Sequence, residues 1–185
     1  NFKGEILMNQ KIIGTKQLIL SGLFIAFGII LPMCFHVFNM GGPIFLPMHI
    51  PVLISGFLLG PICGAIVGVI TPILSGLLTG MPPVLPTMPI MVLELCGYGL
   101  ISGIVFSKTN KIYLSLISAM IVGRIFALFG AFLASLTFAP DINPIMYIVT
   151  AITTAVPGMI IQLIFIPILI KFLVSNSEIR KSLAS

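Results

Sequence analysis

Residues 49–78, HIPVLISGFLLGPICGAIVGVITPILSGLL, form the stretch that decides the fold of this chain. The stretch is almost entirely apolar and contains 30 residues, whereas a helix needs only roughly 20 apolar residues to cross a bilayer core about 30 Å thick. Its middle holds Gly60-Pro61. Because proline is accepted in the first turn of a helix and not in its interior, we predict that one short helix ends at Gly60 and a second begins at Pro61.

The composition of the whole chain indicates a membrane protein. The 185 residues are 58% hydrophobic and 7% charged, with a mean hydropathy of +1.25, which a soluble domain of this length cannot bury. The first apolar run lacks an A-x-A cleavage pattern, so we expect a retained helix rather than a signal peptide. The sequence therefore predicts one all-α integral membrane domain, 1–185, with six transmembrane helices at 17–35, 49–59, 61–78, 88–106, 112–137 and 147–174.

The positions of the basic residues test this count. With six helices, eight of the nine Lys and Arg residues fall on one side: Lys3, Lys11, Lys16, Lys108, Lys111, Lys171, Arg180 and Lys181. Since cytoplasmic loops are rich in Lys and Arg, both termini (1–16 and 175–185) are expected in the cytoplasm. Topology then explains the net charge of +5, and no nucleic-acid partner is expected.

The connections on the opposite side, 36–48, 79–87 and 138–146, contain no Lys or Arg. Two of them combine apolar residues with breaks such as Gly41-Gly42-Pro43 and TGMPP. Irregular backbone near membrane depth is tolerated where protein buries it or where it lines a cavity. We expect these external loops to fold over a substrate pocket; the alternative is that they are only tight turns.

Ionisable side chains inside the spans are costly and mark functional sites. Such residues are His36, His49, Glu94 and Arg124. Counting from the helix ends, the depths of Glu94 and Arg124 differ by roughly 8 Å, which a long arginine side chain can bridge. The pair either fixes helix packing, binds a ligand, or does both.

Polar residues near the same outer side complete a candidate small-molecule site. The predicted substrate-binding residues are His36, Asn39, His49, Thr79, Glu94, Tyr98, Arg124, Asn143 and Gln162. Several methionines gather there too, and thioethers with two histidines are ligands for Cu(I). We prefer the interpretation that methionine lines an adaptable apolar pocket, with no metal.

No phosphate-binding G-x-x-x-x-G-K-[ST] loop, H-E-x-x-H or G-x-S-x-G motif occurs in the chain, so we expect neither ATP hydrolysis nor enzyme activity. Small-xxx-small patterns occur at Gly22–Ala26 and at Gly64–Gly68. Such faces let another helix approach closely. We expect them to dock a partner that supplies energy.

The element order, together with FLPMHIPVL and LLTGMPP, resembles the S components of energy-coupling factor (ECF) vitamin transporters over Gln17 to Val174. LPMHIP and TGMPP most resemble the pantothenate group. The resemblance implies an external vitamin pocket in a bacterial plasma membrane protein. It also implies a transmembrane T subunit docked at Gly22 and Ala26, where the family normally has Ala-x-x-x-Ala. Two cytoplasmic ATPases would use the ATP, so this chain is expected to need no cofactor.

Other functions remain open at this stage. The vitamin could be another small compound, such as a pyridoxine-like ring. A solitary proton-coupled secondary transporter would use Glu94 and the histidines as a relay, but internal inverted repeats are lacking. A membrane enzyme or assembly factor would need a second catalytic group near Glu94, and the sequence offers none.

Overall fold

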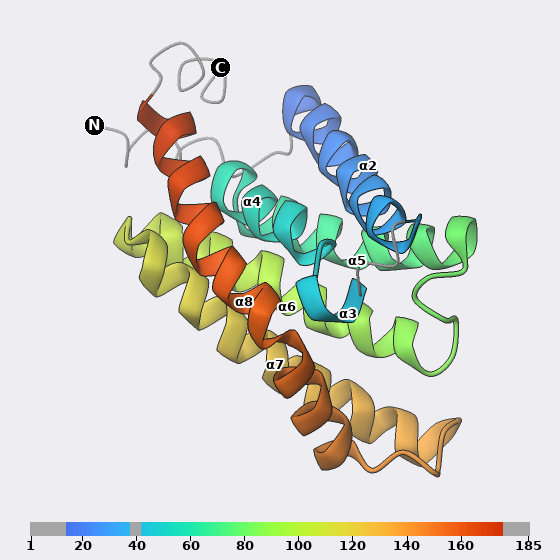
Figure 1. Ribbon diagram of the computed structural model, residues 1–185. Helices are drawn as coiled ribbons and strands as arrows, with labels where there is room; N and C mark the ends of the chain where they lie inside the picture. The colour runs from blue at the N-terminus through green and yellow to red at the C-terminus, as the bar shows by residue number, and fades with distance from the viewer. Residues whose placement is uncertain (1–13, 38–41, 176–185) are drawn as a thin grey trace.

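The structure is a computed structural model that describes residues 14–37 and 42–175. Most of the described residues are helical, and they form the elements labelled in Figure 1. These elements are α2 (Thr15–Val37), α3 (Gly42–Phe45), α4 (His49–Leu59), α5 (Pro61–Thr79), α6 (Thr87–Thr109), α7 (Ile112–Thr137) and α8 (Pro144–Ser175).

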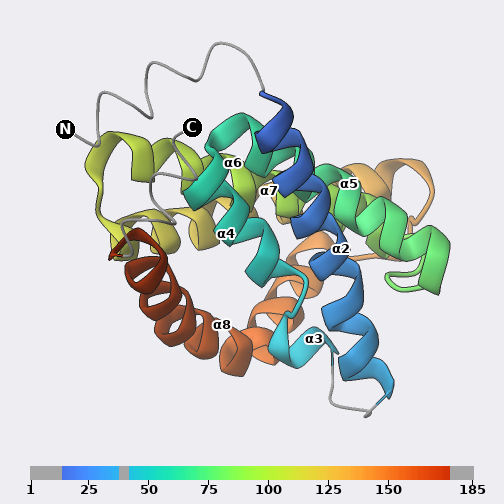
Figure 2. The same ribbon diagram turned by 90° about the horizontal axis from the view of Figure 1, so that it is seen from above.

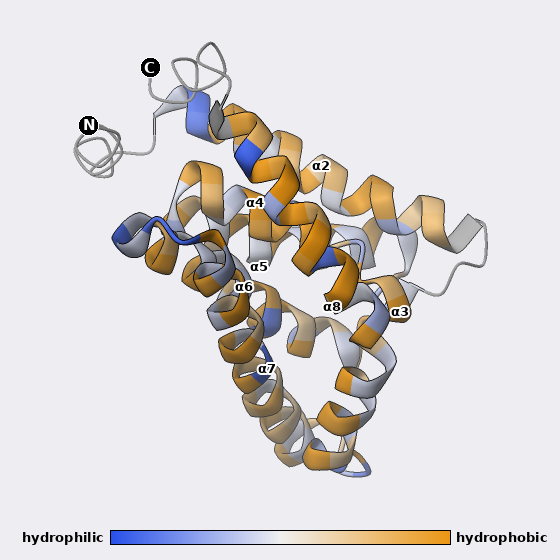
Figure 3. Cartoon of the chain, turned by 60° about the vertical axis from the view of Figure 1, so that its left-hand side comes forward, coloured by the Kyte–Doolittle hydropathy of each residue, from blue (hydrophilic) through white to orange (hydrophobic). Residues whose placement is uncertain are grey.

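The prediction of six membrane spans is confirmed. Six stretches of the described chain are long and apolar enough to cross a membrane, and the second of them, Gly42–Leu59, joins α3 and α4. The predicted 112–137 span matches α7, whereas α8 begins at Pro144, three residues before the predicted start. Hydrophobic colour covers most of the helical surface, and the α6–α7 connection is hydrophilic (Figure 3). The outward side chains thus suit lipid rather than water.

The predicted break at Gly60-Pro61 is confirmed. Gly60 ends α4 with a φ of 89°, a conformation that a residue with a Cβ adopts only with strain. Its N–H donates to the Gly56 carbonyl at 3.2 Å. Pro61 then occupies the first position of α5, where its missing N–H leaves no helical hydrogen bond unmade. One long apolar run therefore becomes two helices.

Helix α6 lies at the centre of the bundle and packs on α4, α5 and α7. Its contact with α5 is backbone to backbone: a Cβ on Gly64 would collide with the Gly99 carbonyl, and one on Gly68 would collide with the Leu95 carbonyl. The prediction that Gly64 and Gly68 dock a partner is therefore wrong. Small residues at this face serve packing inside the chain.

The other small-xxx-small face is directed outward. Gly22 and Ala26 are both exposed on α2, and nothing lies within 4 Å of a Cβ placed on Gly22. The neighbouring large side chains on this helix, including Leu23 and Phe27, are exposed as well. This face of α2 therefore has no partner within the described residues.

The prediction that the first loop, residues 38–48, folds back on the bundle is confirmed for residues 42–48, and residues 38–41 lie outside the described residues. Helix α3 lies against the middle of α8 (Figures 1 and 2), where a Cβ on Gly158 would collide with the backbone of Ile44 and Phe45. The Gln162 side-chain amide donates to the Leu46 carbonyl at 3.4 Å. We call the end of the bundle that holds this loop and the α5–α6 and α7–α8 connections the loop end.

Replacing Gly64 with alanine tests the α5–α6 contact. We expect the variant to unfold at a lower temperature in detergent, with a loss of about 1–3 kcal/mol, because the added methyl meets backbone that cannot move aside. Gly22→Ala is the matched control and should not lower the unfolding temperature. Equal melting curves for Gly64→Ala and the wild type would contradict the close packing.

Candidate substrate-binding site

A cavity of about 680 Å³ opens at the loop end between α8 on one side and α4, α6 and α7 on the other. Its volume lies within the range of small-molecule sites. Apolar groups from the first loop and the α5–α6 connection form much of its wall, and four methionines, Met48, Met81, Met91 and Met146, line it. The polar lining residues are His49, Thr87, Glu94, Arg124, Asp141, Asn143, Tyr147, Thr150 and Thr154.

Three charged or ionisable side chains meet at the inner wall of this cavity. The Arg124 guanidinium donates through Nη1 to Glu94 Oε1 at 2.7 Å, and His49 Nε2 lies 3.3 Å from the same oxygen. The side chains of Arg124, Glu94 and His49 are 11%, 8% and 2% exposed. The predicted pairing of Glu94 with Arg124 is therefore confirmed, and it joins α6 to α7 while His49 adds α4.

Tyr98 packs against His49 of this cluster and does not line the cavity. Its ring is fully buried and meets the His49 ring edge to face, with centroids 4.9 Å apart. A Cβ on Gly123 would collide with the Tyr98 ring. The glycine next to Arg124 thus lets α6 and α7 approach closely where the ion pair forms.

Several buried polar atoms near the cluster make no hydrogen bond within the described part of the chain. They are Arg124 Nε and Nη2, His49 Nδ1 and Tyr98 Oη. An unpartnered buried donor costs free energy, so native proteins rarely leave one without a structural or functional reason. Arg124 lines the cavity, and its Nε and Nη2 atoms are buried without a partner among the described residues.

The remaining predicted site residues are placed differently. The Thr79 hydroxyl donates to the Ser75 carbonyl at 2.7 Å, outside the cavity lining. Asn143 lines the rim, where its Oδ1 accepts from the Met146 N–H at 3.1 Å. Gln162 is fully buried behind the first loop. Asn39 and the side chain of His36 lie outside the described residues.

Five of the polar lining residues are not in the predicted substrate-binding set, although the sequence places Thr87 and Tyr147 among the polar residues of the outer side: Thr87, Asp141, Tyr147, Thr150 and Thr154. Three of them follow a helical repeat, because positions 147, 150 and 154 are three and four residues apart and share one face of α8. This polar stripe in an apolar helix was the signal available. Asp141 lies at the rim, roughly 20 Å along α7 from Arg124 at 1.5 Å per residue.

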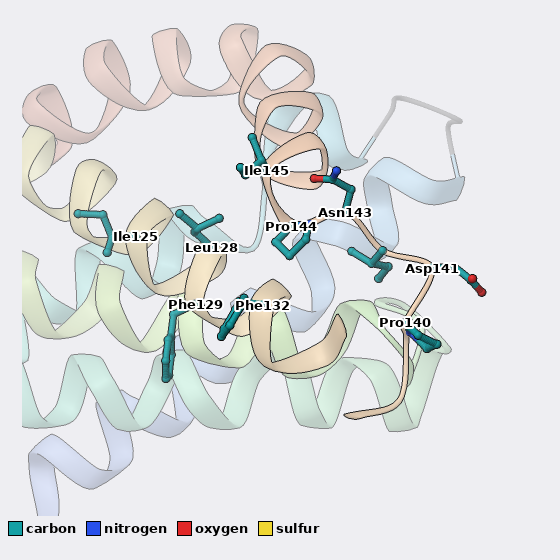
Figure 4. A pocket seen from close by; sticks show the side chains of 10 residues that line it. Ile125, Leu128, Phe129, Phe132, Pro140, Asp141, Asn143, Pro144 and Ile145 are labelled. Carbon is teal, nitrogen blue, oxygen red and sulfur yellow. The ribbon is translucent and has the colours of Figure 1, made fainter. Parts of the chain in front are cut away.

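A second hollow, of about 810 Å³, lies between the outer half of α7 and the α7–α8 connection. Its walls are apolar side chains such as Leu128, Phe129 and Phe132, and the Asp141 carboxylate points away from them (Figure 4). Asn143 and Asp141 line both hollows, so the connection separates them. The second hollow lacks the convergent polar groups of a specific site.

No metal centre of the usual kind is formed, since no three His, Cys, Asp or Glu side chains converge to hold an ion within the searched, described residues. The fold and the site together define a multi-pass membrane protein with a largely apolar cavity that opens at one end and holds a charged cluster at its inner wall. Residues 16–174 match the family described as ECF transporter, substrate-specific component. The chain belongs to this family.

No curated protein and no solved structure matches the chain. Family membership makes the protein a transport subunit of the cell membrane rather than an enzyme, and implies T-subunit and ATPase partners and a small substrate. It also favours the ECF assembly over the alternative of a solitary secondary transporter.

Glu94→Gln tests the buried ion pair. The substitution keeps the side-chain shape and removes the charge that neutralises Arg124, so we expect the free energy of unfolding to fall by about 3 kcal/mol. Thermal unfolding in detergent measures the change. The double variant Glu94→Gln/Arg124→Met should recover part of the loss, because no uncompensated cation remains; a double variant less stable than Glu94→Gln alone would contradict this account.

Proposed function

We propose that the chain captures a small carboxylate vitamin, with pantothenate as the best candidate, in the cavity at the loop end. The observation that carries this proposal is the pair of unpartnered nitrogens, Nε and Nη2, on the buried guanidinium of Arg124. These two nitrogens share one edge of the guanidinium plane. That edge matches the two oxygens of a carboxylate in a bidentate pair.

Glu94 supports the same interpretation. It occupies only Nη1 of Arg124, so it holds the guanidinium in place and leaves the other edge free. A bound carboxylate would then add a second anion beside the one arginine, and His49 at the same Glu94 oxygen supplies a further donor that limits the repulsion. The site is therefore suited to an anion without exposing a lone cation to the membrane interior.

The rest of the cavity favours pantothenate over the pyridoxine-like alternative. Met48, Met91 and Met146 line it, and methionine adapts to branched apolar groups such as the paired methyls of pantothenate. A pyridoxine-like ring lacks a carboxylate and would leave the free edge of Arg124 buried and unpaired, which is costly. The likeness of LPMHIP and TGMPP to the pantothenate group points the same way.

We further propose that the loop end faces outward and that the T subunit receives this chain at α2. The described lysines lie at the end of the bundle opposite the loop end: Lys16, Lys108, Lys111 and Lys171. The positive-inside rule assigns that end to the cytoplasm. ATP is used by the partner ATPases, and this chain supplies binding alone. Moving a body whose spans hold one compensated charge cluster through lipid is less costly than moving isolated charges.

Arg124→Gln tests the carboxylate site. Panthenol has a hydroxymethyl group where pantothenate has its carboxylate, so the ratio of the two affinities reports the charged contact. We expect the wild type to prefer pantothenate, and Arg124→Gln to weaken pantothenate binding about 10- to 100-fold while changing panthenol binding little, since the lost hydrogen bonds are charge-assisted. Isothermal titration of the purified chain measures both.

Retained panthenol binding also shows that the Arg124→Gln variant is folded. Equal preference for pantothenate in the variant and in the wild type would remove Arg124 from the site. Wild-type protein that binds neither compound would contradict the assignment of pantothenate.

Gly22→Leu and Ala26→Leu test the docking face. A leucine at either position fills the shallow surface on which a second helix would lie. We expect both variants to lose co-purification with the T subunit and ATPases while pantothenate binding to the isolated chain stays the same. Val156→Leu, at an exposed position of α8, is the control and should co-purify normally; normal co-purification of both α2 variants would place docking elsewhere.

A further inference from the structure

The α8 wall of the cavity carries two threonine hydroxyls that no other part of the described chain uses. We infer that Thr150 and Thr154 bind hydroxyl groups of the substrate, on the side of the molecule away from its carboxylate. This inference rests on the proposed function and extends it from the charged end of the ligand to the neutral end.

The behaviour of the other threonines makes these two distinctive. In apolar surroundings a helical threonine satisfies its hydroxyl by donating to the carbonyl four residues earlier. Such bonds run from Thr71 to Val67 at 2.7 Å, from Thr109 to Val105 at 2.8 Å and from Thr137 to Leu133 at 2.8 Å. Thr79 and Thr153 make the same bond. The threonines that face lipid or the packed core are therefore self-satisfied.

Thr150 and Thr154 differ in both respects. Each has a preceding helical turn with a carbonyl to accept its proton, yet neither hydroxyl makes a hydrogen bond within the described residues, and both side chains line the cavity. Positions four apart on a helix lie one above the other. The two hydroxyls thus form a short polar ladder that is open to whatever fills the cavity.

The ladder lies opposite the charged cluster. Thr150 and Thr154 are six and ten residues from the start of α8, so they lie roughly 9 and 15 Å below it at 1.5 Å per residue. Arg124 is thirteen residues from the end of α7, roughly 20 Å from the connection that leads into α8. Thr154 and Thr150 therefore lie roughly 5 and 10 Å nearer to the loop end than the charged cluster, so a ligand whose carboxylate pairs with Arg124 reaches them by extending toward the rim.

The chemistry of the ladder specifies the ligand groups that it can recognise. A threonine hydroxyl both donates and accepts hydrogen bonds, so it suits neutral groups that do the same, such as alcohols. A site built to bond a hydroxyl rejects an analogue that lacks it, because the site's own polar groups are then left unpaired. A purely apolar acid would consequently be discriminated against.

The experiment compares pantothenate with N-(3,3-dimethylbutanoyl)-β-alanine, which keeps the carboxylate and the amide but has neither hydroxyl. Isothermal titration is carried out on the purified full chain and on Thr150→Val, Thr154→Val and the double variant. Valine keeps the threonine shape and removes the hydroxyl. Thr153→Val is the matched control, because its hydroxyl donates to the Val149 and Thr150 carbonyls at 2.9 and 3.0 Å and does not line the cavity.

We expect the wild type to prefer pantothenate over the hydroxyl-free acid. Each single variant should weaken pantothenate binding about three- to tenfold, the range of one neutral hydrogen bond, and leave binding of the hydroxyl-free acid unchanged; the double variant should lose most of the preference. Thr153→Val should change neither affinity.

Two results would overturn the inference while leaving the carboxylate site intact. One is a double variant that keeps the full wild-type preference. The other is a double variant that weakens both acids equally, which would assign the threonines to packing alone. The ratio of the affinities for pantothenate and panthenol depends on Arg124 and is measured separately in the same proteins. Failure of the wild type to bind any of the three compounds would overturn both proposals together.

Discussion

A single carboxylate oxygen organises the interior of this protein. Oε1 of Glu94 accepts from Arg124 of α7 at 2.7 Å and lies 3.3 Å from His49 of α4, so three helices meet at one atom. In a membrane span each of these groups would be costly alone. Together they hold α4, α6 and α7 in one arrangement, in which Nε and Nη2 of Arg124 have no partner among the described residues.

The close packing that surrounds this cluster explains why the cavity opens where it does. Glycines bring α5 onto α6 and bring the Tyr98 ring onto α7 beside Arg124, so these helices leave no space between them. Helix α8 instead packs along α3 and α7. The space between α8 and α6 is therefore not filled by side chains, and it forms the cavity of the candidate site.

The first loop closes one side of that space through contacts that cannot be predicted from its own sequence. Leu46 adopts a φ of 50°, which is uncommon for a residue with a side chain. Its carbonyl accepts from Gln162 of α8, 116 residues later in the chain, and Gly158 admits the loop backbone. This loop therefore forms part of the cavity wall.

The sequence by itself determined the features that depend on composition or on local backbone chemistry. Hydropathy sets the spans, the missing N–H of Pro61 and the freedom of Gly60 set the break, and the cost of lone buried charges made the pairing of Glu94 with Arg124 predictable. Only the tertiary structure decided which face of each helix turns inward. It directed Gly64 and Gly68 into the bundle and left Gly22 and Ala26 outside. It also placed Thr150 and Thr154 in the cavity, whereas Thr79, a predicted site residue, lies outside it. The reason is physical: the rotation of an apolar helix about its own axis is set by packing against neighbours far away in the chain. The sequence of a helix that is hydrophobic on all sides gives little indication of which face turns inward.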